Sequence, residues 1–200
     1  MKRHALLAAL LAMCAFASGC ARLGDNLRTV EDGLLYRSGQ MRAGTLEHVI
    51  AHRGIATVIN LRGGHPETAW YGDELEVCAK HGVDHHDFLW SKDRLVPPES
   101  LLGYLDVIDT ARAPILVHCQ GGVHRAAVAA ACFLLHRGAT PNEVRGQFGL
   151  FFNDAPIGGI VDLYERSTLP FDRWVETEYP ALYRACEPNR ATSSSSESAP

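Results

Sequence analysis

The stretch "ILVHCQGGVHRAA", residues 115–127, joins an apolar run to an alanine-rich segment through a short loop that contains two glycines. Its first residues are typical of a buried strand, and the alanine-rich run that begins at Arg125 predicts a helix. Such a junction brings loop N–H groups and the positive end of a helix together, which favours anion binding. We call residues 119–125 the signature loop; it predicts an anion site with the thiol of Cys119 at its base.

Strand and helix patterns alternate along the rest of the chain. Apolar and β-branched runs predict further strands within residues 33–40, 55–63 and 83–90. Helical spacing with terminal Pro and Gly signals predicts helices within residues 42–54, 66–82, 97–111 and 140–150, and one or two short helices within 151–186. This alternation predicts an α/β fold with a mostly parallel central sheet of four to five strands flanked by helices.

The first twenty residues have the features of a targeting segment. Two basic residues precede an apolar stretch that ends in "ASGC", residues 17–20, which resembles the lipobox of bacterial lipoproteins. The resemblance implies a signal peptide over 1–19 and a lipid on Cys20 that anchors the protein to the membrane of the bacterial cell envelope. Ala21 favours the outer membrane, on the periplasmic side. The alternative is an ordinary secretory signal cut near Gly19.

The remaining terminal segments differ in composition from the centre of the chain. Residues 20–26 are interpreted as a tether, and the serine-rich residues 189–200 as a disordered tail. One folded domain is therefore expected over residues 27–188.

Composition narrows the class of protein. An apolar fraction of 46% suffices for one sizeable core, and a net charge of −4 argues against a nucleic-acid partner. Six cysteines in 200 residues are too few for a disulfide scaffold. We expect a monomer.

The signature loop resembles a known motif. "HCQGGVHRA" is similar to the HCxxGxxR signature of cysteine-dependent protein tyrosine and dual-specificity phosphatases, with His118, Cys119, Gly122 and Arg125 at its defining positions. "LYRSGQ", "VINLRG" and the helix before "ILVHC" also resemble small bacterial and plant-type dual-specificity phosphatases. The resemblance covers about residues 33–150 and implies a dual-specificity phosphatase-like fold.

The same resemblance assigns roles to the residues of the motif. Cys119 would attack phosphorus, Arg125 would bind two phosphate oxygens, and His118 would support the cysteine from behind. The loop N–H groups that would bind phosphate belong to Gln120, Gly121, Gly122, Val123, His124 and Arg125. The loop and Arg125 neutralise the phosphate, so neither a metal nor an organic cofactor is expected. The substrate would be a phosphorylated protein or a phosphorylated small molecule.

A general acid should lie between the third strand and the helix that precedes "ILVHC". We expect Asp93 to be the general acid, because it lies in the polar, proline-bounded part of that segment, and Asp87 is the alternative. Family members usually have Ser or Thr after the arginine, whereas this chain has Ala126, which predicts slow breakdown of a cysteinyl-phosphate. His124 could bind an anionic substrate or simply face solvent.

Other interpretations stay open at this level. The same pocket would suit a pseudo-phosphatase that binds phosphorylated ligands without turnover, an inositol-polyphosphate or other small-molecule phosphatase, or a sulfurtransferase, although the position of Arg125 fits the last class less well. Arg62 could brace the signature loop or pair with an acid.

Two further groups of residues have side chains that suit metal binding or redox chemistry. His85 and His86, near His81, would point to opposite faces of a strand, which argues against a metal site. Cys78 and Cys132 are expected to be buried, and either could form a reversible disulfide with the signature-loop thiol.

Overall fold

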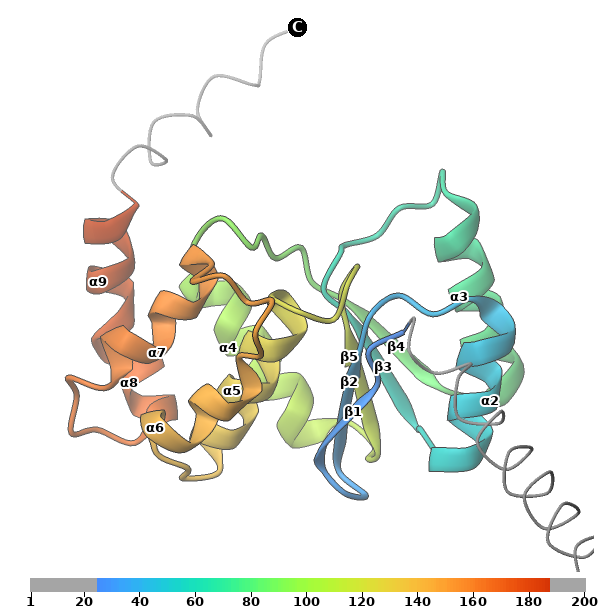
Figure 1. Ribbon diagram of the computed structural model, residues 1–200, viewed down its shortest axis with the longest axis horizontal. Coiled ribbons are helices and arrows are strands. Elements are labelled where there is room, and N and C mark those ends of the chain that lie inside the picture. The colour runs from blue at the N-terminus through green and yellow to red at the C-terminus, as the bar shows by residue number, and fades with distance from the viewer. Residues whose placement is uncertain (1–24, 188–200) are drawn as a thin grey trace, which may run out of the picture.

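The computed structural model describes residues 25–187 (Figure 1). The signal peptide, the lipidated Cys20 and the serine-rich tail predicted above lie outside these residues. No helix within 25–187 combines the length and the apolar character that a membrane crossing requires.

A five-stranded sheet forms the centre of the molecule (Figure 1). Its order is β1-β2-β5-β3-β4, and β1 is an antiparallel edge strand while the other four strands are parallel. The strands are β1 (Arg28–Glu31), β2 (Leu35–Ser38), β3 (Thr57–Asn60), β4 (Asp84–Asp87) and β5 (Ile115–His118). The predicted α/β class, the mostly parallel sheet and its strand number are confirmed.

Helices cover both faces of this sheet. The α-helices are α2 (Ala43–Arg53), α3 (Ala69–His81), α4 (Pro98–Thr110), α5 (Arg125–His136), α6 (Pro141–Val144), α7 (Gly159–Tyr164), α8 (Phe171–Thr177) and α9 (Tyr179–Cys186). Two 3₁₀ turns, η2 (Arg145–Gln147) and η3 (Pro156–Gly158), lie between α6 and α7. In Figure 1, α2 and α3 lie on one side of the sheet, and α4 to α9 lie on the other.

The central strands are apolar on both faces, as a doubly covered sheet requires. On β5, Ile115 and Val117 belong to the larger core beneath α4 and α5, whereas Leu116 belongs to the smaller core beneath α2 and α3. Ile59 and Val58 of β3 divide between the two cores in the same way. Successive side chains therefore alternate between two hydrophobic cores.

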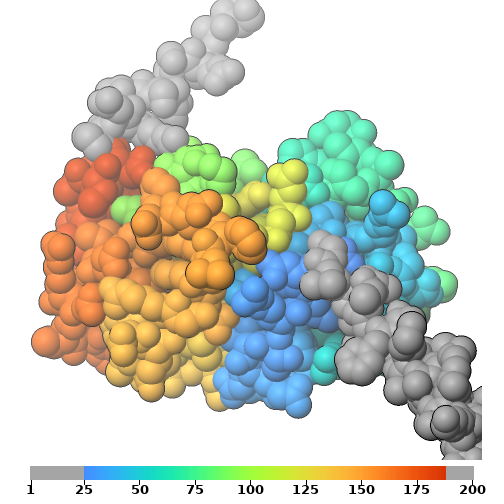
Figure 2. All heavy atoms as spheres, viewed as in Figure 1, coloured from blue at the N-terminus to red at the C-terminus, as the bar shows by residue number. Residues whose placement is uncertain are grey.

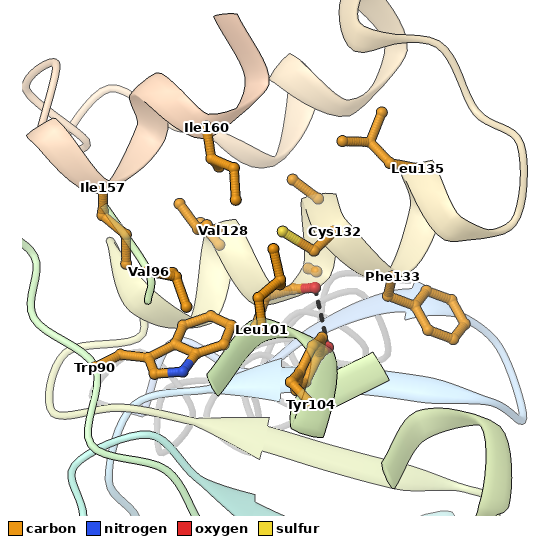
Figure 3. Packing of buried hydrophobic residues seen from close by; sticks show 14 of the residues in the cluster. Trp90, Val96, Leu101, Tyr104, Val128, Cys132, Phe133, Leu135, Ile157 and Ile160 are labelled. Atoms are coloured by element: carbon orange, nitrogen blue, oxygen red, sulfur yellow. Dashed lines mark hydrogen bonds between the residues drawn. The ribbon is translucent and has the colours of Figure 1, made fainter. Parts of the chain in front are cut away.

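Helix α5 runs through the larger core (Figure 3). Every side chain from Ala126 to Ala131 is fully buried, and small residues here let neighbouring elements approach closely. The Tyr104 hydroxyl of α4 donates to the Ala129 carbonyl at 2.9 Å, which satisfies this buried polar group (Figure 3). Because α5 begins at Arg125, its packing fixes the end of the signature loop.

Some helix boundaries differ from the sequence expectation. Helix α3 begins at Ala69 rather than near Pro66, because both the N–H group and the hydroxyl of Thr68 bond the His65 carbonyl, at 2.9 and 2.8 Å, and close a turn first. Helix α6 begins with a capping box that Thr140 forms with Glu143.

The folded part fills one continuous body when all atoms are drawn (Figure 2). In that view the segment that contains η2, η3 and α7 lies next to the N-terminal strands, although the two are far apart in the sequence. The contact between Arg37 of β2 and Gln147 of η2, described below, joins these two regions.

Candidate active site

The four parallel strands end in one row. In their registers, His118 at the end of β5 is paired with Ser38 of β2 and Asn60 of β3, and Asn60 is paired with Asp87 of β4. The loops that follow these strands therefore emerge at the same edge of the sheet, where ligands of open parallel sheets bind (Figure 1). The signature loop is one of them, because it follows β5 directly.

The carbonyl groups of the signature loop are held by neighbouring segments. The Gln40 N–H group donates to the Gln120 carbonyl at 3.0 Å. The Gly122 carbonyl accepts from Arg37 Nη1 at 2.7 Å and from Asn26 Nδ2 at 3.0 Å. These contacts pair the Gln120 and Gly122 carbonyls within the protein and tie the loop to neighbouring segments.

The N–H groups of the loop are left for a ligand. Within residues 25–187, those of residues 120–125 have no protein acceptor. A cavity of about 390 Å³ opens beside them, and its lining consists of Lys92, Cys119, Gln120, Gly121, Val123, His124 and Arg125. Unpaired N–H groups around a concavity at a helix N-terminus are a binding site for an oxyanion.

Gly122 is required for this loop shape. Its φ angle is +66°, in the left-handed region that disfavours side chains. A Cβ atom there would lie 2.5 Å from the Gly39 nitrogen and 2.6 Å from the Ser38 carbonyl carbon. Only glycine lets the loop pack this closely against the end of β2.

Cys119 and Arg125 lie at opposite ends of the loop and both line the cavity. Cys119 is 3% exposed, and its N–H group donates to the Ser38 carbonyl at 3.3 Å. Arg125 Nη1 donates to the carbonyls of Leu61 and Trp90 at 3.2 and 3.4 Å, which orients the guanidinium. Its other N–H groups have no partner within the described residues, so they can bind two oxygens of a phosphate.

Sequence reasoning missed Glu74, a buried carboxylate bonded to His118, the residue before Cys119. It is 3% exposed; its Oε1 accepts from His118 Nε2 at 3.1 Å and from His85 Nε2 at 2.9 Å, and its Oε2 accepts from Gln40 Nε2 at 2.6 Å. Burial alone would raise the pKa of this carboxyl, but the hydrogen bonds from His118, His85 and Gln40 lower it to about 2.

A signal for Glu74 was present in the sequence. The other buried residues of α3 are Tyr71, Val77 and Cys78, and Glu74 lies on the same stripe at helical spacing. A carboxylate on an apolar stripe needs partners, and His118, immediately before Cys119, supplies one of them.

Arg37 was also missed. It lies on β2, is 2% exposed, and bonds both the Gly122 carbonyl and Gln147 of η2, whose Oε1 and carbonyl accept at 3.1 and 2.8 Å. Burial and then the nearby charge of Arg28 lower its pKa to about 10, while Cys119 acts in the opposite direction. Arg37 thus ties the signature loop to the segment after α6.

The two candidate acids lie in different surroundings. Asp93 is 69% exposed and accepts from Lys92 Nζ at 2.6 Å; Lys92, but not Asp93, lines the cavity. Asp87 accepts from Asn60 Nδ2 at 2.7 Å and from the Tyr71 hydroxyl, and the latter contact raises the pKa of Tyr71 to about 12. Both oxygens of Asp87 thus have partners, whereas only Oδ1 of Asp93 has one among the described side chains.

His124, His81 and His85 lie in different surroundings. His124 lines the cavity, and its ring centre lies 5.5 Å from that of Phe152. His81 bonds Glu47 at 2.9 Å, away from the Glu74 partner of His85. Within the part of the chain described, no three His, Cys, Asp or Glu residues form a group suited to a metal ion.

The four cysteines between residues 25 and 187 are all free thiols. Cys78 and Cys132 are buried as expected. Burial raises the pKa of both thiols, that of Cys78 to about 12, so neither is ionised near neutral pH.

Comparison with known proteins identifies the family. Residues 24–156 match the sequence model of the DSP-PTPase phosphatase domain of Swiss Army Knife proteins. Over 85 residues, 42% of this chain, the sequence is 28% identical to the dual specificity protein phosphatase CDC14C of Symphalangus syndactylus, and the match spans 16% of that relative's length.

Solved structures share the fold. The core catalytic domain of the PP-IP phosphatase SIW14 from S. cerevisiae, crystallised with citrate, is 17% identical with a TM-score of 0.53, over 82% of this chain and 92% of that one. TpbA from P. aeruginosa is 21% identical with a TM-score of 0.50, over 72% and 92%. At these identities the likeness concerns the fold alone. The family match covers more than half of the chain, including the whole signature loop, and the protein therefore belongs to the DSP-PTPase phosphatase domain family of Swiss Army Knife proteins.

Proposed function

We propose that the protein hydrolyses phosphate monoesters through a cysteinyl-phosphate intermediate. The observation that carries this proposal is the arrangement of the signature loop: its Gln120 and Gly122 carbonyls have partners within the protein, its N–H groups have no acceptor among the described residues, and Cys119 and Arg125 line one cavity. A nucleophile beside an oxyanion site is the arrangement that phosphoryl transfer to cysteine requires.

The proposed reaction has two steps. In the first, the Cys119 thiolate forms an S–P bond while the P–O bond to the leaving group breaks, and Asp93 gives its proton to the leaving oxygen. In the second, water attacks phosphorus, loses a proton to the Asp93 carboxylate, and the S–P bond breaks to release inorganic phosphate and the thiolate. Arg125 and the loop N–H groups stabilise the phosphoryl oxygens throughout, so no cofactor enters this scheme.

Two substrate classes suit this chemistry. Phosphotyrosine or other phosphorylated side chains fit the dual-specificity family, and phosphorylated small molecules fit the description of SIW14 as a PP-IP phosphatase. Two observations favour a pseudo-phosphatase. Ala126 is buried at the position where a hydroxyl would assist turnover, and Asp93, the proposed acid, is exposed and does not line the cavity.

Hydrolysis of an aryl phosphate under reducing conditions tests the proposal. The unmodified protein should release phosphate and the Cys119→Ser variant should not. Equal activity in the two proteins would exclude Cys119 as nucleophile. Inactivity of both, with vanadate still bound, would instead establish a binding module.

We further propose that the mature protein is anchored in the bacterial cell envelope by a lipid on Cys20, because residues 17–20 fit a lipobox. The mass of the mature N-terminal peptide tests this. A peptide that starts at Cys20 without a lipid would contradict it.

A further inference from the structure

Arg62 has no role in the mechanism above, but it is bonded to residues that support the signature loop. It follows Leu61, whose carbonyl accepts from Arg125 Nη1 at 3.2 Å. The Leu61 N–H group donates to the His118 carbonyl at 2.9 Å, so this segment is bonded to the base of the signature loop. The Arg62 N–H group is held in turn by Asn60 Oδ1 at 2.8 Å. The backbone of Arg62 is therefore fixed beside Arg125.

The side chain of Arg62 is held in place as well. Its guanidinium carbon lies 3.6 Å from the centre of the Trp70 ring, a close cation–π stack. Its Nη1 donates to Gln40 Oε1 at 3.0 Å, and Gln40 is itself bonded to Gln120 and Glu74. These contacts fix the plane of the guanidinium but use only part of its donor capacity.

No carboxylate neutralises this guanidinium. Among residues 25–187, Arg62 forms no salt bridge with an Asp or Glu. Several cations on the protein surface do have acidic partners, namely Lys80, Arg112, Arg137 and Arg145. Burial and then repulsion by Arg125 lower the pKa of Arg62, while Glu74 and Cys119 act in the opposite direction. Arg62 follows Leu61, whose carbonyl holds the Arg125 guanidinium, so an anion that contacts both arginines would relieve the repulsion between them.

We propose that Arg62, held by Trp70 and Gln40, is a second anion-binding residue that takes a phosphate group adjacent to the one bound by Arg125. The preferred substrate then carries two neighbouring phosphate groups, as in a diphosphate or a vicinal bisphosphate. This inference rests on the proposed function in one respect only, namely that one of the two phosphate groups is cleaved. Binding of the pair needs no turnover.

Calorimetry on the full chain with Cys119→Ser separates binding from catalysis. The probes are inorganic phosphate and pyrophosphate in metal-free buffer at one ionic strength. We expect pyrophosphate to bind at least about tenfold more tightly than phosphate, because a second charge-assisted contact is formed. Adding Arg62→Gln should reduce this preference to about twofold while the phosphate Kd changes by less than about threefold.

Two more variants keep the test decisive. Arg53→Gln removes an arginine at the end of α2, which lies 5.3 Å from the ring centre of Tyr36, and it should leave the preference unchanged, which controls for net charge. Trp70→Leu keeps the charge of Arg62 but removes the ring on which it stacks. It should lower the preference for pyrophosphate without abolishing it, and it still tests the proposal if Arg62→Gln does not fold.

Three results would overturn the proposal. Equal affinity for the two anions in the starting protein would show that no second site exists. Parallel weakening of both by Arg62→Gln would show that Arg62 only braces the loop. If neither anion binds, the anion site at the signature loop is refuted. If the pyrophosphate preference is present but aryl phosphate is not hydrolysed, only the proposed function is refuted.

Discussion

Nε2 of His118 lies 3.1 Å from Oε1 of Glu74, so a carboxylate from α3 is bonded to the residue that precedes Cys119. Both side chains are almost fully buried, at 2% and 3% exposed. A buried carboxylate keeps its charge only with good partners, and here His85 and Gln40 complete the set. The contact links α3, β4, β5 and the signature loop at one point.

Replacement of Glu74 by Gln should lower the free energy of unfolding at neutral pH by about 3 kcal/mol, because it breaks a buried, charge-assisted network. The effect should depend on pH. The pKa of Glu74 in the folded protein, about 2, lies below its ordinary value of 4.5, so its stabilisation is complete above 4.5 and is lost as the pH falls toward 2. Urea unfolding measured across this range checks both statements.

The exposed Glu76 of the same helix is the matched control for Glu74. Glu76→Gln should change stability by less than about 0.5 kcal/mol. Similar losses from the two variants would mean that the buried network contributes nothing special.

Gly122→Ala should destabilise the protein by about 3 kcal/mol and remove vanadate binding, because the added Cβ meets backbone at 2.5 Å and the φ angle is +66°. Gly121→Ala is the control, since its nearest neighbour would be a Val123 methyl at 4.0 Å. Thermal unfolding and vanadate titration of the pair should separate them clearly. A stable, vanadate-binding Gly122→Ala protein would contradict the loop geometry.

Asp93→Asn should slow hydrolysis of an alkyl phosphate by about a hundredfold and that of 4-nitrophenyl phosphate much less, since only the poor leaving group needs the proton. Asp87→Asn should instead lower stability, because it disturbs the contacts with Tyr71 and Asn60. Kinetics with both substrates and a melting curve distinguish the two roles. Full activity of Asp93→Asn on the alkyl ester would remove Asp93 from the mechanism.

Ala126→Ser should speed breakdown of the cysteinyl-phosphate, because a hydroxyl next to Arg125 can assist departure of the sulfur. Rapid-quench trapping of the phosphoenzyme measures its lifetime directly. Ala127→Ser controls for burial of a hydroxyl in α5, since both alanines are fully buried. Equal phosphoenzyme lifetimes in the Ala126→Ser variant and the unmodified protein would refute slow breakdown as the consequence of Ala126.

Iodoacetate should label Cys119 and the exposed Cys186 at neutral pH, and leave Cys78 and Cys132 unmodified. Burial raises the pKa of the last two thiols, and the thiolate is the reactive form. Vanadate should protect Cys119 but not Cys186. Peptide mass mapping gives the result, and labelling of Cys119 that vanadate does not slow would argue against an anion site at this loop.

The sequence by itself determined the four parallel strands, the helices between them and the position of the signature loop, but it did not predict the edge strand β1 or the number of helices after residue 151. Local patterns of neighbouring residues indicate these features: alternating or continuous apolar runs, helix-ending glycines, and the Thr140-Pro141 pair at the start of α6. The chemistry of Cys119, Gly122 and Arg125 was visible for the same reason, because all three lie within one short loop.

The tertiary structure alone decided which distant residues support that loop. Glu74 lies 44 positions from His118, Arg37 lies 85 from Gly122, and Asn26, assigned by sequence to the tether, lies 96 from Gly122. Local periodicity carries no information on such pairs. They meet because β5 inserts between β2 and β3, and this strand order brings the ends of four separate chain segments to one edge of the sheet.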